Sequence, residues 1–285
     1  MNENDRMFPM AARIATLAAL VLAAVGCAGP DPAPGPRCTP GQLDTLTPGV
    51  FTFATDQPAY RPWFVADQPA NGEGFESAVA YAAAEQLGYS PDRVRWARLP
   101  FSTAMAPGPK PFDAAISQFS ITDQRREIVD FSAPYYDVDQ AVLTVAGSAA
   151  AGLRSTTALG RLRLGAEAGT TGALTARMLS HATPITVYDS NDQAIAALSG
   201  GKVDALVMDL PTAQRAAGDL PDGVVVGQLP RAAERVEQLA MLLDKDSPLT
   251  GCLSSAVEAL RADGVLDRLQ RQWMAATPVP MLTSG

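Results

Sequence analysis

Short apolar runs alternate with helical apolar stripes along most of the chain. Runs rich in β-branched and aromatic residues predict strands at residues 50–54, 94–97, 113–116 and 141–145. Between the first two strands, apolar side chains recur at steps of three and four residues. They predict a helix from Gly74 to Leu87 that Gly88 ends. Strands that alternate with helices predict a parallel sheet with helices on both faces.

The same pattern restarts after a segment of small residues at 147–152. Further strands are predicted at residues 162–166, 185–188 and 203–208. One helix follows the stretch Gly169–Gly172, and a second helix, with Asn191 as its cap, ends at Gly200. This second series of strands and helices predicts a separate lobe.

The chain then returns through an apolar run at 239–243 and ends in two helices, near 253–260 and 266–273. Together with the run at 141–145, this return predicts two crossings between the lobes, which form a hinge. The predicted fold class is α/β with two lobes and a ligand cleft between them. The first lobe is predicted to comprise residues 43–143 and 238–277, and the second lobe residues 144–237.

The N-terminus is typical of an export signal. Arg6 and Arg13 precede an apolar run of about a dozen residues, which is too short to span a hydrocarbon core of ~30 Å. Small residues then precede Cys27, which resembles the lipobox of bacterial lipoproteins, where this cysteine is lipidated and begins the mature chain. Ordinary signal cleavage beside an incidental cysteine is the alternative. We expect residues 1–26 to be a signal peptide and the Pro-rich residues 27–42 to be a lipid-anchored linker.

Two cysteines remain after Cys27. In an exported protein, Cys38 and Cys252 are expected to form a disulfide that closes a long loop, and two free thiols are the alternative.

Composition excludes several classes of function. The formal net charge is -8, which argues against nucleic acid as a partner because phosphate binding needs clustered Lys and Arg. His181 is the single histidine, so Ser-His-Asp catalysis and multi-histidine metal sites would depend on that residue alone. Since it stands in no such motif, we expect His181 to be a solvated histidine at a helix end. We expect no metal, no cofactor and no catalytic residue.

Candidate binding residues follow the predicted strands, where open α/β sheets bind their ligands. The segment from Asp56 to Trp63 follows the first strand, and Gln118 to Arg125 follow the third. Gly169 to Thr171 lead into a helix N-terminus, which favours an anion, and Asp209 ends a strand of the second lobe. A guanidinium, a helix N-terminus and a carboxylate suit a zwitterion.

Several motifs in order resemble the solute-binding proteins of polar amino-acid ABC importers. The main one runs from Ile116 to Arg125 (ISQFSITDQR) and continues as VDFSAPYY at 129–136. The other matching stretches are Gly74-Phe75-Glu76, Gly169-Thr170-Thr171, residues 203–209, and residues 262–266 with Trp273. The resemblance covers residues 45–275 and implies a type II periplasmic-binding-protein-like fold.

The resemblance also implies a ligand site. The residues that it places there are Asp56, Tyr60, Trp63, Gln118, Ser120, Arg125, Thr170, Thr171 and Asp209. Arg125, helped by Ser120 and Thr171, would bind an α-carboxylate, and Asp209 would bind the α-ammonium. Tyr60 and Trp63 would cover the ligand from the first lobe, and Gln118 would contact its polar groups.

Each residue also has a structural interpretation. Arg125 would be an exposed, salt-bridged arginine, Asp209 a turn cap before Pro211, and Trp63 a core residue. Thr170 and Thr171 would form a plain helix cap. Glu76 and Asp204, although they lie in matched motifs, are expected to be structural.

The sequence therefore predicts an exported, lipid-anchored binding protein on the outer face of the bacterial cytoplasmic membrane. It would be a monomer that captures a free polar amino acid by lobe closure and delivers it to an ABC permease with its ATPase subunits. The alternatives are an enzyme on the same scaffold, such as a dehydratase, or a ligand sensor.

Overall fold

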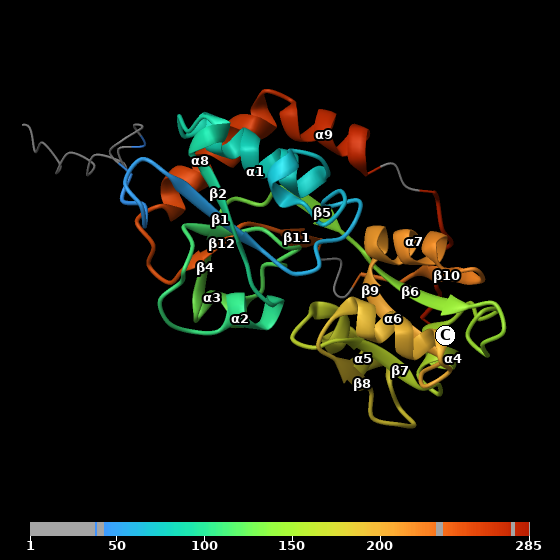
Figure 1. The fold of residues 1–285 in the computed structure, drawn as a ribbon. Coiled ribbons are helices and arrows are strands. Elements are labelled where there is room, and N and C mark those ends of the chain that lie inside the picture. Colours follow the sequence, from blue (N-terminus) through green and yellow to red (C-terminus); the bar gives the residue numbers. More distant parts are fainter. Residues whose placement is uncertain (1–37, 39–42, 232–235, 275–276, 285) are drawn as a thin grey trace, which may run out of the picture. The chain divides into compact units, whose positions relative to one another are not determined.

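Two five-stranded sheets organise the chain in the computed structural model, which describes residues 38, 43–231, 236–274 and 277–284 (Figure 1). The predicted signal peptide, Cys27 and nearly all of the predicted linker lie outside the described residues. None of the helices in the described ranges is long and apolar enough to cross a membrane.

The first sheet has the strand order β2-β1-β3-β12-β4. Its strands are β1 (Phe51–Thr55), β2 (Val94–Arg98), β3 (Ala114–Ala115), β4 (Val129–Phe131) and β12 (Leu242–Asp244). β1 pairs in parallel with β2 and β3, as alternating strands and helices predict. β12 pairs antiparallel with β3 and β4 because the chain re-enters this sheet from the second lobe. The prediction of a parallel sheet is therefore wrong for this part of the fold.

Helices of the first lobe cover this sheet. They are α1 (Phe75–Gln86), α2 (Phe101–Met105), α3 (Asp123–Arg126), α8 (Thr250–Ala262) and α9 (Val265–Trp273). α1 packs against α8 and α9, and apolar side chains of all three helices share one core with Phe51 and Phe53 of β1. A disulfide joins Cys38 to Cys252 of α8, with Cα atoms 5.3 Å apart, which confirms the predicted pairing.

The second sheet has the strand order β10-β6-β9-β7-β8. Its strands are β6 (Gln140–Val145), β7 (Leu164–Glu167), β8 (Thr186–Tyr188), β9 (Ala205–Asp209) and β10 (Gly223–Gln228). Its helices are α4 (Thr156–Leu159), α5 (Thr171–Leu179), α6 (Asn191–Ser199) and α7 (Leu210–Asp219). Ser190, rather than Asn191, caps α6, since its hydroxyl accepts a hydrogen bond from the Gln193 amide. β9, β7 and β8 run parallel, whereas β6 pairs antiparallel with both of its neighbours, β9 and β10, so this sheet is also mixed.

The hinge differs from the predicted crossings at 141–145 and 239–243. β5 (Tyr136–Val138) and β11 (Glu237–Leu239) pair antiparallel as a separate two-stranded sheet between the lobes. Residues 140–143 were assigned to the first lobe from the sequence, but they lie in the second sheet because β6 pairs with β9 and β10. The first lobe boundary therefore falls before Gln140.

A third segment also crosses between the lobes. After α9, the last described residues reach the second sheet, where Met281 forms a parallel bridge with Gln228 and Leu282 is buried in the core (Figure 1). Gly227 permits this approach, since a Cβ there would lie 2.6 Å from the carbonyl oxygen of Pro280. The prediction of only two crossings is therefore wrong.

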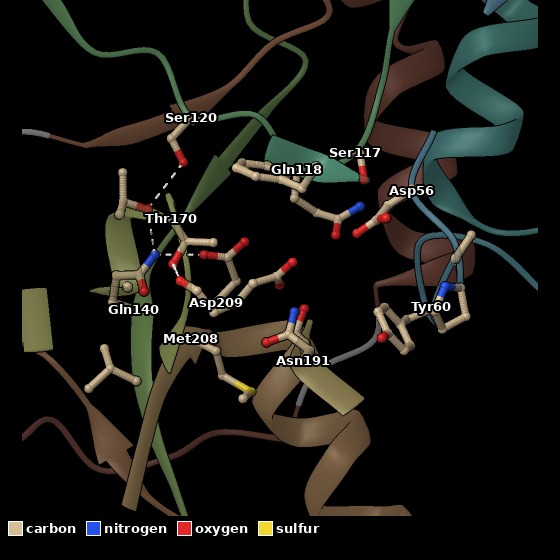
Figure 2. Close-up of a pocket in the computed structure, with 18 of the residues that line it drawn as sticks. Asp56, Tyr60, Ser117, Gln118, Ser120, Gln140, Thr170, Asn191, Met208 and Asp209 are labelled. Atoms are coloured by element: carbon tan, nitrogen blue, oxygen red, sulfur yellow. Dashed lines mark hydrogen bonds between the residues drawn. The ribbon is translucent and has the colours of Figure 1, made fainter. Parts of the chain in front are cut away.

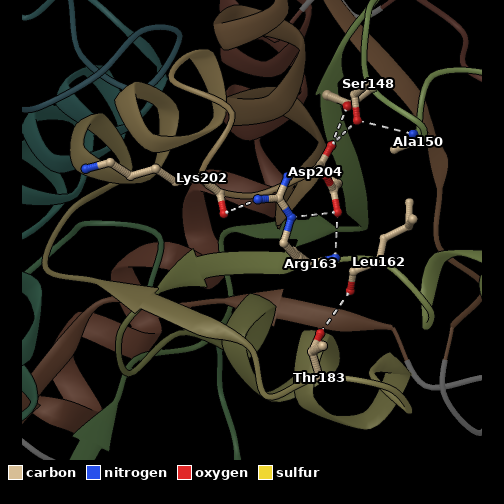
Figure 3. Close-up of polar contacts among 8 residues, drawn as sticks. Ser148, Ala150, Leu162, Arg163, Thr183, Lys202 and Asp204 are labelled. Atoms are coloured by element: carbon tan, nitrogen blue, oxygen red, sulfur yellow. Dashed lines mark hydrogen bonds and ion pairs between the residues drawn. The ribbon is translucent and has the colours of Figure 1, made fainter.

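Asp204 has a structural role in the second lobe (Figure 3). Its carboxylate accepts hydrogen bonds from the Arg163 guanidinium, at 2.6 Å, and from the Arg163 amide. Its carbonyl oxygen accepts the hydroxyls of Thr144 and Ser148. Asp204 thereby joins the beginnings of β7 and β9 to β6, which is the structural role expected from the sequence.

Candidate functional site

A pocket lies where strands of both sheets end. The first lobe contributes to the lining through the segments that follow β1 and β3. The second lobe contributes through β6, β7 and β9 and through the starts of α5, α6 and α7. Figure 2 shows Asp56 and Gln118 reaching into the pocket from the first lobe, with Gln140 and Asp209 facing them from the second. All the predicted ligand residues except Trp63 line this pocket.

Arg125 is buried in the pocket wall, with 8% of its surface exposed. It lies on the short helix α3, where the Thr122 hydroxyl accepts a hydrogen bond from the Arg125 amide. Its guanidinium donates to the carbonyl oxygens of Ser120 (2.6 Å) and Gly169 (2.9 Å), which belong to different lobes. Its Cζ atom lies 5.6 Å from the centroid of the Phe101 ring.

No carboxylate among the described residues forms an ion pair with Arg125. The alternative of an exposed, salt-bridged arginine is therefore wrong. A buried guanidinium without a bound carboxylate is costly, and a carboxylate on a ligand would lower that cost.

The start of α5 supplies backbone donors to the same region. Thr170 is its N-cap, and the Thr170 hydroxyl accepts from the Ala173 amide and donates to the carbonyl oxygen of Glu167. The amides of the first helical turn have no acceptor within the helix, so they are suited to an anion. Thr170 is thus the cap of a helix whose first residues, Thr171 and Gly172, line the pocket.

The hydroxyls of Ser120 and Thr171 are engaged by a residue that the sequence analysis did not single out. Both hydroxyls donate to the same carboxylate oxygen of Glu237, which lies on the hinge strand β11. The hydrogen bond from the Thr171 hydroxyl is 2.6 Å long. Gln140 donates to the other oxygen at 3.2 Å. Glu237 therefore joins the two lobes and the hinge at the edge of the site, and it competes with any ligand carboxylate for these two hydroxyls.

Asp209 ends β9 and precedes α7. Its side chain accepts no capping hydrogen bond within α7, which contradicts the alternative of a turn cap. Instead, Gln140 Nε2 donates to Asp209 Oδ1 at 2.6 Å. Burial, and then the charge of Glu237, raise the pKa of Asp209. A cation in the pocket would favour the ionised form of this carboxyl.

Gln118 depends on a buried carboxyl group beneath it. Its backbone has a positive φ of 51°, and its amide donates to Glu76 Oε1 at 2.7 Å. The Gln118 side chain and the Tyr135 hydroxyl also donate to Glu76, which is fully buried in α1. Burial raises the pKa of Glu76 to about 7. Glu76 is therefore structural, as expected, and it holds Gln118 at the pocket.

Trp63 does not line the pocket, and the prediction that it covers the ligand is corrected. Its side chain is fully buried and packs against Phe75 and Tyr136, because a side chain of this size fills the core beside α1. Its indole Nε1 donates to the Thr212 hydroxyl of the second lobe at 3.0 Å. Trp63 therefore positions Thr212, which does line the pocket. Tyr60 lines the pocket, with the Arg215 guanidinium 5.1 Å from its ring centroid.

Glu167 was also missed by the sequence analysis. It is the last residue of β7 and lines the pocket with only 6% of its surface exposed. Burial, and then the charges of Asp56 and Asp209, raise the pKa of Glu167 to about 8. The rule that ligands bind at the carboxyl ends of strands would have found this residue, since it follows the predicted strand at 162–166 directly.

The chain is similar to known proteins. The sequence model of the family described as bacterial extracellular solute-binding proteins, family 3, matches residues 51–276. An L-arginine-binding protein of Pseudomonas aeruginosa is 27% identical over 258 residues, which cover 82% of this chain and 95% of that protein. The ABC transporter glutamine-binding protein GlnH of Bacillus subtilis is 23% identical over 278 residues, which cover 94% of this chain and 97% of that protein.

A solved structure also resembles the chain. The ancestral amino acid-binding protein AncCDT-1, described as a precursor of cyclohexadienyl dehydratase, superposes on this chain with a TM-score of 0.66 at 27% identity. The match covers 80% of this chain and 96% of that one. Together with the two sheets, this similarity confirms the predicted two-lobed, type II periplasmic-binding-protein-like fold.

Proposed function

Because the chain belongs to family 3 of the bacterial extracellular solute-binding proteins, we propose that it captures one free amino acid between its lobes and delivers it to an ABC permease. The observation that supports this most is Arg125, a buried guanidinium without an ion pair among the described residues, in a pocket that Asp209 of the other lobe also lines. Relatives named for arginine, histidine and glutamine binding support an amino-acid ligand.

In the proposed complex, Arg125 and the first amides of α5 bind the α-carboxylate, and Asp209 binds the α-ammonium. A guanidinium offers two parallel N–H donors to a carboxylate, and the helix start adds further donors. Arg125 lies in the first lobe and Asp209 in the second, so one zwitterion contacts both lobes. Binding then favours lobe closure, because only the closed arrangement makes both contacts.

Titration calorimetry of the protein against each of the twenty amino acids tests this function. We expect saturable binding of at least one of them, and a ligand at ~100 times its dissociation constant should stabilise the fold by about 2.7 kcal/mol. Binding of a carboxylate that lacks an amine, with no binding of any amino acid, would refute the proposal and favour the enzyme or sensor alternatives.

We also propose that Cys27 is lipidated, so that the monomeric protein stays on the outer face of the cytoplasmic membrane beside its permease and the ATPase subunits. The small residues before Cys27 and the Pro-rich segment after it support this. Replacing Cys27 with alanine should move the protein from the membrane fraction to the soluble fraction, because the acyl chains anchor it. Ala28→Ser is the control, since it changes the neighbouring residue, keeps Cys27 and should leave the protein in the membrane fraction. Membrane retention of Cys27→Ala, with no acyl label on the wild type, would contradict the anchor.

A further inference from the structure

The pocket holds more carboxyl groups than a zwitterion needs. Three carboxylates line it, from Asp56, Glu167 and Asp209, whereas Arg125 is the basic side chain among the lining residues. In the proposed complex, Arg125 neutralises the ligand carboxylate and Asp209 neutralises the ligand ammonium. The carboxylates of Asp56 and Glu167 are then left over.

No basic residue of the described chain pairs with either leftover carboxylate. The nearby Arg98 donates to the backbone carbonyl of Asp56, at 3.0 and 2.8 Å, while its ion pair is with Asp67. Glu167 has the Asn191 side chain as a hydrogen-bond partner, which is neutral. A carboxylate as buried as that of Glu167 normally has a cation beside it.

Both carboxylates line the same pocket although they come from different lobes. Asp56 follows β1 of the first sheet and Glu167 ends β7 of the second. After burial itself, the charge of Asp56 is the largest cause of the raised pKa of Glu167. Like charges brought together in a low-dielectric site disfavour ionisation until a cation joins them.

Two further features of the pocket suit a ligand with a cationic side chain. One calls for a hydrogen-bond donor and the other offers an aromatic ring. Gln140 has 8% of its surface exposed, and its buried Oε1 has no hydrogen-bond donor, although its Nε2 is fully used. Phe101 presents a ring to the same pocket, which suits the aliphatic stem or the flat face of a cationic side chain.

Glu167 is also well placed relative to the ammonium site. β7 and β9 are parallel neighbours, with Gly165 opposite Leu206, so the ends of the two strands that hold Glu167 and Asp209 lie side by side. Neighbouring strands are about 4.8 Å apart. An amino acid whose α-ammonium lies at Asp209 is therefore within reach of Glu167 at the neighbouring strand end.

We propose that the ligand is an amino acid with a positively charged side chain and that Glu167, together with Asp56, binds that side-chain cation. The inference rests on the proposed function and adds the class of amino acid to it. A neutral side chain would leave the buried carboxylate of Glu167 and the half-buried carboxylate of Asp56 without a cation, and an acidic side chain would be repelled.

Calorimetry with charged and neutral isosteres tests this specificity. Arginine and lysine are compared with citrulline and 6-hydroxynorleucine, which match them in shape but lack the side-chain charge. We expect arginine or lysine to bind at least about tenfold more tightly than its neutral counterpart, and the better of the two identifies a guanidinium or an ammonium ligand. Equal or tighter binding of the neutral isosteres would overturn the inference and leave amino-acid binding intact. If no amino acid binds, both proposals fail.

Variants assign the specificity to Glu167. Glu167→Gln should remove most of the preference for the charged ligand over its isostere, while binding of the isostere changes by less than about threefold. Glu258→Gln, which removes the same charge from an exposed position on α8, should keep the full preference. If circular dichroism shows that Glu167→Gln is misfolded, Asp56→Asn is the second variant. An unchanged ratio of the two affinities in the folded variant would overturn the role of Glu167.

Discussion

Replacing Arg125 with alanine is expected to weaken amino-acid binding by about tenfold to a hundredfold, or abolish it. A hydrogen bond to a charged group contributes roughly 1.5–3 kcal/mol, and each 1.4 kcal/mol is a factor of ten in affinity. Arg125 also donates to the carbonyl oxygens of Ser120 and Gly169, so the variant loses a contact between the lobes as well. Calorimetry with the best ligand from the amino-acid panel measures the loss.

Arg126→Ala is the matched control for Arg125→Ala. Arg126 is the next residue of α3, has the same charge and is exposed. Its removal should leave the affinity almost unchanged. If both variants fold, by circular dichroism, and bind the ligand as the wild type does, then Arg125 does not bind the ligand carboxylate.

Asp209→Ala is expected to weaken binding by a similar factor, for the complementary reason. The variant leaves the ligand ammonium without its carboxylate, and Gln140 loses the acceptor that it contacts at 2.6 Å. The comparison of an amino acid with its deaminated analogue separates the two roles. The wild type should discriminate strongly between them, and Asp209→Ala should discriminate little. Undiminished discrimination in that variant would place the ammonium elsewhere.

Replacing Gly74 with alanine is expected to destabilise the fold by about 3 kcal/mol or more. Gly74 precedes α1 with φ of 100°, and a Cβ there would lie 2.4 Å from the carbonyl oxygen of Trp63 and 2.6 Å from the Cα of Phe64. These are backbone atoms that cannot rotate away. The same carbonyl accepts the Glu76 amide at 2.9 Å, so a shift of this loop also disturbs the start of α1.

Gly72→Ala separates the clash from the conformational effect. Gly72 also has a positive φ, of 74°, but a Cβ there would meet no atom within 4 Å. Gly72→Ala should lower the free energy of unfolding only by the strain of an alanine in the left-handed conformation, about 1–2 kcal/mol. Urea unfolding followed by circular dichroism gives both free energies of unfolding. Equal losses in the two variants would show that the contact with Trp63 is not what requires glycine at position 74.

Much of the site followed from the sequence because strand ends and motif order are local properties. Asp56, Arg125 and Asp209 each follow or end a predicted strand, and the structure places all three at one pocket. The pairing of Cys38 with Cys252 was also predictable, since only two cysteines remain after Cys27. These inferences needed residue types and their order along the chain, together with the rule that parallel strands end at a common edge.

The direction of strand pairing and the neighbours of each side chain depend on contacts between distant parts of the chain. β12 and β6 have the apolar composition of the parallel strands, and only their partners make them antiparallel. Glu237 has no local motif, yet hinge pairing brings its carboxylate to Ser120 and Thr171, which lie more than sixty residues away. The sequence by itself thus determined the family, the alternation of elements and most of the pocket residues. Only the tertiary structure placed Trp63 in the core and Glu167 beside Asp56, because burial and charge proximity arise when the two lobes pack together.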